Sequence, residues 1–297
     1  MREYFFRFFK YVGKAVSGKG LANLPFATVL YQALYRCLKP RGIVEISAGG
    51  HTLFVNSRDT GSAPYLIMHG QWDPPQTEVF EKLLKPGMTF VDVGANIGYF
   101  TLLAARAVGS TGRVVAFEPD RGNFSLLQNN VERNGYQNVE LVQEAVSDKA
   151  GTATFYLKKE NLSAHSLVRE ENTTEVQVET VSLDEFFKNK PIPDVIKIDV
   201  EGAEPAVLIG MHDILAKSEK MAVITEFYPR AIASFGYAPE AYLRAFTDVG
   251  FLLYRLAEQA GVAPVAMSAK DIAEASAKTD EKFLLNILCL KNWDYRL

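Results

Sequence analysis

The sequence from residue 90 to residue 101 runs Phe90-Val-Asp-Val-Gly-Ala-Asn-Ile-Gly-Tyr-Phe-Thr101. It begins as a short apolar run of the kind found in buried strands, and from Ile97 onward its apolar residues recur at the spacing of a helix face. Gly94 and Gly98 lie between the two patterns. The segment predicts a strand that turns sharply into a helix. Its backbone N–H groups are expected to be free for a ligand, because glycine permits close approach.

Glycine spacing separates two classes of cofactor-binding protein that use such a turn. The dinucleotide fingerprint Gly-x-Gly-x-x-Gly would require glycine where Asn96 and Tyr99 stand. Asp92 instead begins the pattern Asp-x-Gly-x-x-x-Gly, which is typical of S-adenosylmethionine (SAM) methyltransferases. The sequence therefore favours a SAM site, with an ordinary turn around a buried aspartate as the alternative.

A second apolar strand, residues 114–117, ends in Glu118-Pro119-Asp120. A carboxylate at the tip of the strand beside the glycine turn can accept hydrogen bonds from both ribose hydroxyls of an adenosine. Glu118 taken alone fits a solvated loop equally well, and its distance from the glycine motif favours the ligand role. Asp120 is predicted to be the N-cap of the following helix.

A third strand is predicted over residues 139–146, with Glu144 and Ala145 at its end as candidates to face an adenine ring. From Gly151 the pattern changes to short alternating strands, which indicates an inserted β-rich segment beside the cleft. His165 lies in a polar loop of this insertion and is a candidate proton acceptor, although a lone loop histidine is more often solvated.

An acidic cluster follows the fourth predicted strand, in the segment Ile198-Asp-Val-Glu-Gly202. Asp199, Glu201 and Glu204 have no lysine or arginine between them, so a sulfonium, a divalent cation or a proton is expected to offset their charge. Helix capping is the alternative for the two glutamates. Asp199 or Glu201 is the first candidate for the general base, His165 the second, and Glu226 at the end of a fifth strand the third. A metal is not favoured, because no histidine lies nearby.

Composition limits the class of protein. The chain has 297 residues, 48% hydrophobic residues and a net charge of −3, so disorder and general nucleic-acid binding are not expected. Cys37 and Cys289 lack metal-ligand spacing and are expected to be free thiols. No apolar run is long enough to span a bilayer, and the sequence predicts a soluble cytoplasmic protein.

The start of the chain differs from the rest. Residues 1–41 contain eight basic residues and one acidic residue, and aromatic residues crowd the beginning. Basic amphipathic helices can lie on membrane surfaces, but packing on the main domain is favoured over peripheral membrane contact through residues 1–20. Residues 42–55 alternate around Gly49-Gly50 and predict a β-hairpin. The predicted division is an extension over residues 1–60 and a main domain over 61–297.

Five motifs in order resemble the FkbM family of SAM-dependent methyltransferases. They are Phe90–Thr101, Phe117-Glu-Pro119, Glu144-Ala-Val-Ser-Asp148, Ile198–Gly202 and Asn286–Leu290. The resemblance, which covers about residues 64–290, implies an α/β fold with a Rossmann-like class I sheet of seven strands, the last antiparallel, and O-methyl transfer. It implies cofactor contacts by Asp92, Gly94, Asn96, Gly98 and Glu118, with the flanking Ala95 and Pro119, and places the Asp199–Glu201 element near the acceptor.

Three functions compete on the sequence. The first is a SAM-dependent O-methyltransferase that acts on a small-molecule or glycan-like hydroxyl. The second is a non-catalytic SAM-binding member of a biosynthetic complex, and the third, disfavoured by the glycine spacing, is a nicotinamide-dependent oxidoreductase. The sequence does not identify the acceptor or the oligomeric state.

Overall fold

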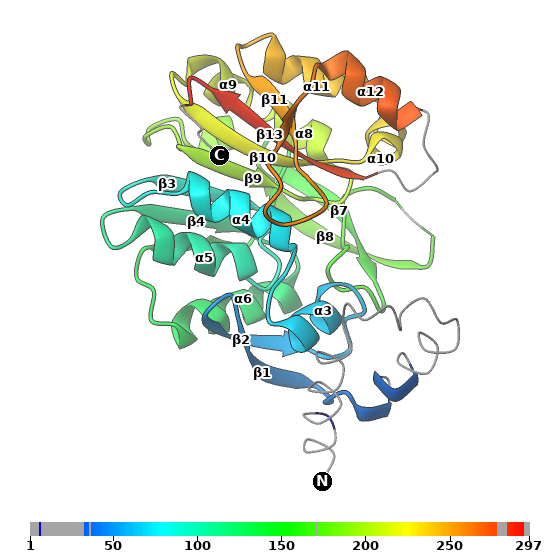
Figure 1. Ribbon diagram of the computed structural model, residues 1–297. Coiled ribbons are helices and arrows are strands. Elements are labelled where there is room, and N and C mark those ends of the chain that lie inside the picture. Colours follow the sequence, from blue (N-terminus) through cyan, green and yellow to red (C-terminus); the bar gives the residue numbers. More distant parts are fainter. Residues whose placement is uncertain (1–5, 7–32, 36, 170, 278–283, 294–297) are drawn as a thin grey trace.

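A mixed β-sheet forms the centre of the protein (Figure 1). The structure is a computed structural model that describes residues 6, 33–35, 37–169, 171–277 and 284–293. The strands of the main sheet are β3 (Thr89–Val93), β4 (Arg113–Phe117), β5 (Val139–Val142), β9 (Val195–Ile198), β10 (Met221–Phe227), β11 (Leu252–Arg255), β12 (Val265–Ala266) and β13 (Leu285–Lys291). Their order across the sheet is β12-β11-β13-β10-β9-β3-β4-β5.

The strand directions confirm the expected class I methyltransferase sheet. The five strands from β10 to β5 run parallel, and β13 lies antiparallel between β10 and β11. The sheet has eight strands rather than the predicted seven, because the short edge strand β12 pairs with β11. The carboxyl ends of the parallel strands meet at one edge, which is where ligands bind in open α/β sheets.

The predicted strand over residues 139–146 is wrong as a single element. The chain leaves the main sheet after Val142 and forms β6 (Ala145–Val146), which pairs with β8 (Thr173–Val181). Strand β7 (Gly151–Lys158) completes this second sheet, in the order β6-β8-β7. The β-rich insertion is confirmed, and it begins inside the predicted third strand because residues 145–146 pair with residues 180–181 rather than with β4.

Helices cover both faces of the main sheet. They are α3 (Ser62–His69), α4 (Pro74–Leu83), α5 (Tyr99–Val108), α6 (Arg121–Arg133), α7 (Leu183–Phe186), α8 (Glu204–Ile209), α9 (His212–Lys217), α10 (Pro229–Ser234), α11 (Pro239–Thr247) and α12 (Ala269–Ala277). Helices α3 to α6 belong to one hydrophobic core and α7 to α12 to the other. Each helix in the described ranges falls short of the length and apolar character that crossing a bilayer requires.

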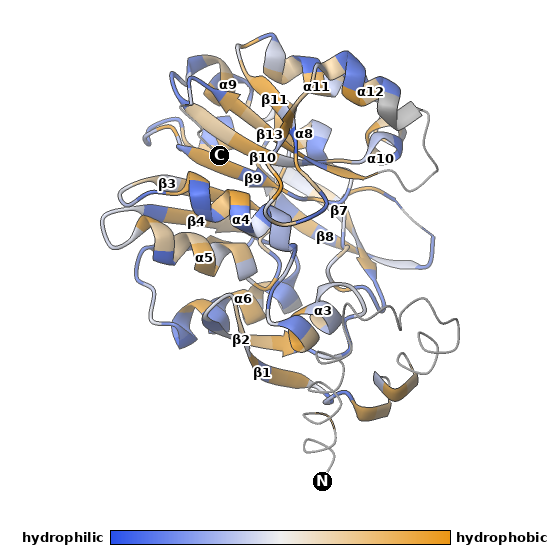
Figure 2. Ribbon diagram, viewed as in Figure 1, coloured by the Kyte–Doolittle hydropathy of each residue, from blue (hydrophilic) through white to orange (hydrophobic). Residues whose placement is uncertain are grey.

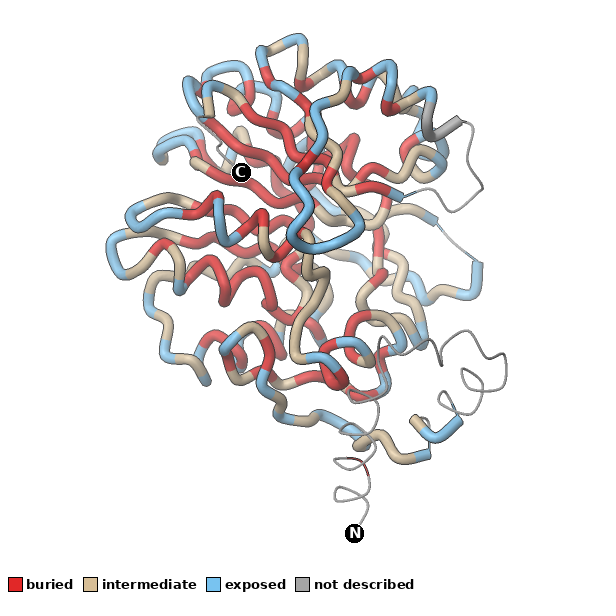
Figure 3. The backbone as a smooth tube through the Cα atoms, viewed as in Figure 1, coloured by how far each residue is buried: buried red, intermediate tan, exposed pale blue. Residues whose placement is uncertain are grey.

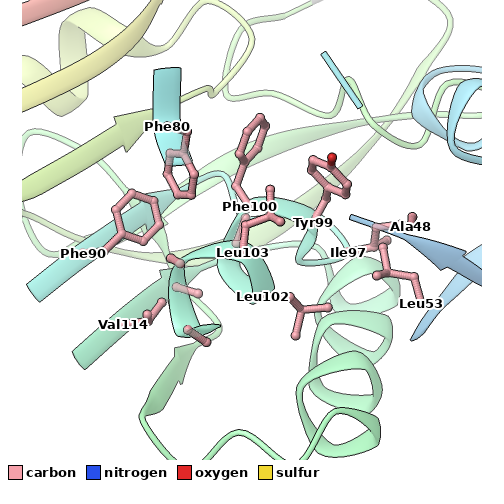
Figure 4. Packing of buried hydrophobic residues seen from close by; sticks show 14 of the residues in the cluster. Ala48, Leu53, Phe80, Phe90, Ile97, Tyr99, Phe100, Leu102, Leu103 and Val114 are labelled. Atoms are coloured by element: carbon pink, nitrogen blue, oxygen red, sulfur yellow. The ribbon is translucent and has the colours of Figure 1, made fainter. Parts of the chain in front are cut away.

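The two cores arise from strand alternation. Neighbouring residues of a strand point to opposite faces, so Phe90 packs in one core and Val91 in the other. The central strands β3, β4, β9 and β10 are therefore largely apolar and buried, as Figures 2 and 3 show. In the first core the ring of Phe80 lies 4.9 Å from that of Phe90 and 5.2 Å from that of Phe100, both edge to face (Figure 4). These contacts hold α4 and α5 against β3, just behind the glycine turn.

The predicted hairpin is confirmed as β1 (Ile43–Ala48) and β2 (His51–Asn56). Helix α6 binds the free edge of β2 through side-chain amides. Asn130 Oδ1 accepts from the N–H of Phe54 at 2.6 Å, and Asn134 bonds both the N–H and the carbonyl of Thr52. The packing predicted for residues 1–41 lies largely outside the described residues, and the boundary at residue 60 stays a prediction.

Two helices, α3 and α4, precede the first strand of the main sheet. Helix α3 begins at Ser62 and helix α4 at Pro74. Asp73 caps α4 by accepting from the N–H of Gln76 at 3.1 Å, and proline follows at the first helical position. Aspartate at the N-cap followed by proline at the first helical position is a common signal for a helix N-terminus, and both residues can be read from the sequence.

Candidate functional site

A cleft lies at the carboxyl ends of β3, β4 and β9, bounded on its other side by the β-rich insertion. The structure brings most of the predicted site residues together there. Those that line it are Asp92, Gly94, Ala95, Asn96, Glu118, Pro119, Glu144, Ala145, His165, Asp199 and Glu201. Of the remaining two, Gly98 and Glu226 do not line the cleft.

The glycine turn uses its own N–H groups within the protein, so the prediction that they are free is wrong. Each N–H from residue 94 to residue 98 donates to an internal acceptor. The acceptors are the Phe117 carbonyl for Gly94 and Ala95, Glu118 Oε2 for Asn96, Asn96 Oδ1 for Ile97, and the Ala95 carbonyl for Gly98. An anionic group such as a pyrophosphate would therefore find no free N–H in residues 94–98.

Packing within the protein explains both glycines. Gly94 has a φ of 81°, and a Cβ atom there would lie 1.9 Å from the carbonyl oxygen of Asp199. At Gly98, with a φ of 93°, a Cβ atom would lie 2.6 Å from Leu127 Cδ1. The turn is thus pressed between the end of β9 and helix α6, and any larger residue would push these elements apart.

Glu118 is held at the end of β4 by two backbone donors. Its Oε2 accepts from the N–H of Asn96 at 2.8 Å, and its Oε1 accepts from the N–H of Asp120 at 2.9 Å. Burial raises the pKa of Glu118 to about 8 despite these two bonds. Each carboxylate oxygen keeps a second lone pair, so the side chain can accept two further hydrogen bonds from a ligand. Asp120 caps α6 as predicted, accepting from the N–H of Asn123 at 2.8 Å.

Asp92 lies at the floor of the cleft with 1% of its surface exposed. Thr101 donates its hydroxyl to Oδ2 at 2.7 Å, whereas Oδ1 has no hydrogen-bond partner among the described residues. Burial raises the pKa of Asp92, and the positive charge of Lys197 opposes that rise. A buried carboxylate oxygen without a donor is costly, so this end of the cleft is suited to a ligand that brings a donor or a positive charge.

Lys197 supplies the positive charge that the acidic cluster was expected to need from outside. It lies on β9, is 3% exposed, and donates from Nζ to Asp199 Oδ2 at 2.9 Å. Asp199 itself is 34% exposed at the cleft wall. An internal cation therefore offsets part of the charge of the cluster, and the signal was in the sequence: Lys197 stands two residues before Asp199, so both side chains share a strand face. Nζ also lies 5.0 Å from the ring centroid of Phe100.

Two further carboxylates crowd the same edge of the sheet. Glu204 Oε1 accepts from the N–H of Val200, and burial raises the pKa of Glu204 to about 7. Burial and the charges of Asp199 and Glu201 raise the pKa of Glu226 strongly. One oxygen of each, Oε2, lacks a hydrogen-bond partner among the described residues. No group of three histidine, cysteine or acidic residues in the described ranges is arranged to hold a metal ion.

The geometry disfavours His165 as a base. Its Nδ1 accepts from the N–H of Lys158 at 3.0 Å, so the neutral ring carries its proton on Nε2 and presents a donor to the cleft. Burial lowers the pKa of His165, which also opposes proton uptake. The loop that carries it is anchored by the buried Asp59, which accepts from the N–H of Leu162 at 2.8 Å and from the hydroxyl of Ser163 at 3.0 Å.

Glu144 and Ala145 line the cleft where the chain crosses from β5 to β6. Sequence reasoning missed other lining residues, notably Trp72, Asn123 and Phe155. Of these, Asn123 had a local signal, since it follows the helix cap Asp120 by three residues. The others reach the cleft from segments far apart in the chain, and no spacing rule joins them.

The family is shown by a comparison of sequence. The model of the methyltransferase FkbM domain matches residues 92–253. The chain belongs to the FkbM methyltransferase family. The matched region starts at Asp92 and contains the glycine turn, Glu118 and the Lys197–Asp199 pair. It also includes the whole β-rich insertion.

Two curated relatives are each 30% identical to part of the chain. Methyltransferase 1 of Beauveria bassiana aligns over 145 residues, which are 41% of this chain and 58% of the relative. The hexuronic acid methyltransferase AglP of Haloferax volcanii aligns over 126 residues, 42% of this chain and 50% of the relative. The chain thus spans about half the length of the curated relatives it matches.

Solved structures resemble the chain only distantly. A precorrin-6y C5,15-methyltransferase from Geobacter metallireducens has a TM-score of 0.41 at 14% identity, covering 72% of this chain and 88% of that one. A SAM-dependent O-methyltransferase from Thermotoga maritima has a TM-score of 0.41 at 12% identity, covering 91% and 83%. Similarity at this level says nothing about the substrate of this chain.

Proposed function

We propose that this FkbM-family protein is a SAM-dependent O-methyltransferase acting on a hydroxyl of a small-molecule or glycan-like acceptor. One observation carries the proposal: the N–H groups of residues 94–98 are all used internally, while the carboxylates of Asp92, Glu118 and Asp199 line the cleft. Such a surface suits a ligand with hydroxyl donors and a positive charge, as SAM has, and repels the pyrophosphate of a nicotinamide cofactor.

The cofactor end of the cleft comprises the residues that would hold SAM. Glu118 would accept both ribose hydroxyls through its two remaining lone pairs, and Glu144 with Ala145 would border the adenine. When bound, SAM would supply a methyl group carried on a positively charged sulfur. Transfer of this methyl group to an acceptor oxygen breaks the sulfur–carbon bond and leaves the sulfur as the neutral thioether of S-adenosylhomocysteine. The orphan oxygen of Asp92 adds negative charge near that end.

Asp199 is the proposed proton acceptor at the other end. A hydroxyl is a poor nucleophile while protonated, so a base must take its proton as the oxygen–carbon bond forms. Lys197 holds Asp199 Oδ2 at 2.9 Å, and no hydrogen bond of the described residues uses Oδ1. Lys197 is thus a positioning residue that leaves one oxygen of Asp199 for the acceptor. Glu201 is the second candidate and Glu226, outside the cleft lining, the third.

The acceptor class draws support from a relative. AglP is named a hexuronic acid methyltransferase, so the same family domain serves a sugar-derived acceptor in that protein. A glycan-like acceptor is therefore the first class to test for this chain.

Calorimetry and a turnover assay test the proposal together. Titration with SAM, S-adenosylhomocysteine, NAD and NADP is expected to give binding of the first two only. Release of S-adenosylhomocysteine across a panel of hydroxyl acceptors is then expected for at least one, and chelator is expected to leave the rate unchanged. Binding of NAD in place of SAM would overturn the proposal. SAM binding without turnover of any acceptor would instead support a non-catalytic SAM-binding protein.

A further inference from the structure

A second cavity, of about 400 Å³, lies beside the cleft. Its walls are the start of α4, the segment after β11 and the start of β13. Because β13 runs antiparallel to β10, its first residues lie at the same edge of the sheet as the carboxyl end of β10. Trp72 lines both the cleft and this cavity, so the two meet at that side chain. The volume is that of a small-molecule site.

The cavity adjoins the carboxylates at the acceptor end of the cleft. Asn286, which lines it, is paired with Glu226 in the β10–β13 ladder and donates from Nδ2 to Asp73 Oδ2 at 3.0 Å. Asp73 lies close enough to Asp199 that the negative charge of Asp199, together with burial, raises the pKa of Asp73. A molecule in this cavity would thus sit beside the proposed proton acceptor.

Gln76 is the amide residue of α4 that lines this cavity. It is 4% exposed and lines the cavity, and its side-chain amide makes no hydrogen bond to any described residue. Solvent in the cavity reaches this amide, which can both donate and accept a hydrogen bond. A hydroxyl group, which is also donor and acceptor, would satisfy it from either side.

Aromatic rings form one wall. Trp72 and Tyr65 meet edge to face with centroids 5.9 Å apart. No acceptor for the indole N–H of Trp72 exists among the described residues. An aromatic face carries partial negative charge and attracts the C–H-bearing face of a saturated ring, while the indole N–H can bond an oxygen at the ring edge.

The charges of the lining select against an anion. Asp73 and Glu258 contribute carboxylates, and no lysine, arginine or histidine is among the described residues that line the cavity. A carboxylate or phosphate on the bound ring would meet like charge without a cation to offset it.

We propose that this cavity binds the methyl acceptor and that the acceptor is an uncharged, polyhydroxylated ring of the sugar class. This inference rests on the proposed methyl transfer and adds to it the location and chemical class of the acceptor. The ring stacks on Trp72, its hydroxyls pair with Gln76 and Asp73, and the hydroxyl to be methylated points past Trp72 toward Asp199.

Substitution of Gln76 tests the cavity. Gln76→Met keeps the length of the side chain and removes the amide, and Gln71→Met makes the same change in a residue that lines neither cavity. With methyl glucoside and related neutral methyl glycosides as probes, Gln76→Met is expected to weaken binding tenfold or more in saturation-transfer NMR. It is also expected to raise the acceptor KM by the same factor, while Gln71→Met changes neither. SAM affinity by calorimetry should stay within about twofold in both variants.

Charge selectivity tests the acceptor class. The wild type is expected to bind the neutral methyl glucoside about tenfold more tightly than the corresponding glucuronide. Equal or better binding of the glucuronide, absence of saturation transfer from every neutral glycoside, or an unchanged KM in Gln76→Met would each overturn the inference. These failures are distinct from failure of the proposed function, which would appear as absent SAM binding or as no release of S-adenosylhomocysteine with any acceptor.

Discussion

The two ends of the cleft hold their carboxylates in different ways. At the end formed by β3 and β4, Glu118 is fixed by two backbone N–H groups that belong to the turns themselves. At the end formed by β9, Asp199 is fixed by one buried lysine side chain, and behind it Glu204 and Glu226 each keep an oxygen without a partner in the described chain.

This difference separates a binding surface from a reactive one. Backbone donors are set by the fold and cannot change with the ligand, so they hold the side chain of Glu118 in the same position before and after binding. Lys197 is the one buried cation near several carboxylates, so the pKa values of these carboxylates depend on the charge of any ligand that binds beside them. On the proposed function, the proton is transferred at the β9 end, and the β3–β4 end binds SAM through side chains that the backbone fixes.

The largest effect is expected from removing the proton acceptor. Asp199→Asn keeps the shape of the side chain and abolishes its basicity, so turnover is expected to fall by about 10²–10⁴-fold. SAM affinity should change little, because the cofactor end is held separately. Steady-state release of S-adenosylhomocysteine measures turnover, and calorimetry measures SAM affinity. Asp213→Asn, which alters an exposed Asp–Lys pair, is the control. Wild-type turnover in Asp199→Asn would remove the distinction between the two ends.

Loss of Lys197 is expected to affect stability as well as activity. Lys197→Met leaves Asp199 and the buried Asp92 without their cation, and breaking a buried pair by removing one partner costs about 3–5 kcal/mol of unfolding free energy. Denaturant unfolding measures the change, and Lys217→Met, at an exposed i,i+4 pair, should cost under about 1 kcal/mol. If Lys197→Met and Lys217→Met lowered the unfolding free energy equally, the buried cation would not stabilise this end of the cleft.

At the β3–β4 end of the cleft, removal of Glu118 is expected to weaken SAM binding without altering the proposed proton acceptor. Glu118→Ala removes two hydrogen-bond acceptors for the ribose, each worth about 0.5–1.5 kcal/mol net, so SAM affinity should fall about tenfold. The fold should survive, which a thermal melt checks, and Glu132→Ala on the exposed face of α6 is the control. Calorimetry that finds unchanged affinity would take Glu118 out of the cofactor site.

The last prediction concerns pH. The pKa of Glu118 rises from 4.5 to about 8 on folding, so between these values the folded protein keeps a proton that the unfolded chain has lost. Stability must then fall as pH rises through this window. Glu118→Gln cannot titrate, and its melting temperature should decline less steeply from pH 5 to pH 8 than that of the wild type. Other carboxylates affect the melting temperature of wild type and variant alike, so only the difference between the two curves of melting temperature against pH reports on Glu118. Parallel curves would contradict a Glu118 that is buried and protonated in this range.

Local patterns predicted much of this molecule. The change of spacing at Gly94–Gly98, the alternation around Gly49-Gly50 and the cap at Asp120 each depend on neighbours within a few residues, and the turn, the hairpin and the helix start all formed where expected. Two equally local features were not predicted. They are the helix start at Asp73-Pro74 and the Lys197–Asp199 pair, in which the lysine lies within an otherwise apolar strand.

Contacts between distant segments decided the rest. The N–H groups of the glycine turn are used because β4 brings Phe117 and Glu118 against them, and residues 145–146 leave the third strand because β8 pairs with them. The second cavity joins Asp73 to Asn286, 213 positions apart. Hydrophobic spacing reports which face of an element is buried but not what it is buried against. The strand and helix pattern could therefore be read from the chain, whereas the partners of each charged group emerged only when the sheet had assembled.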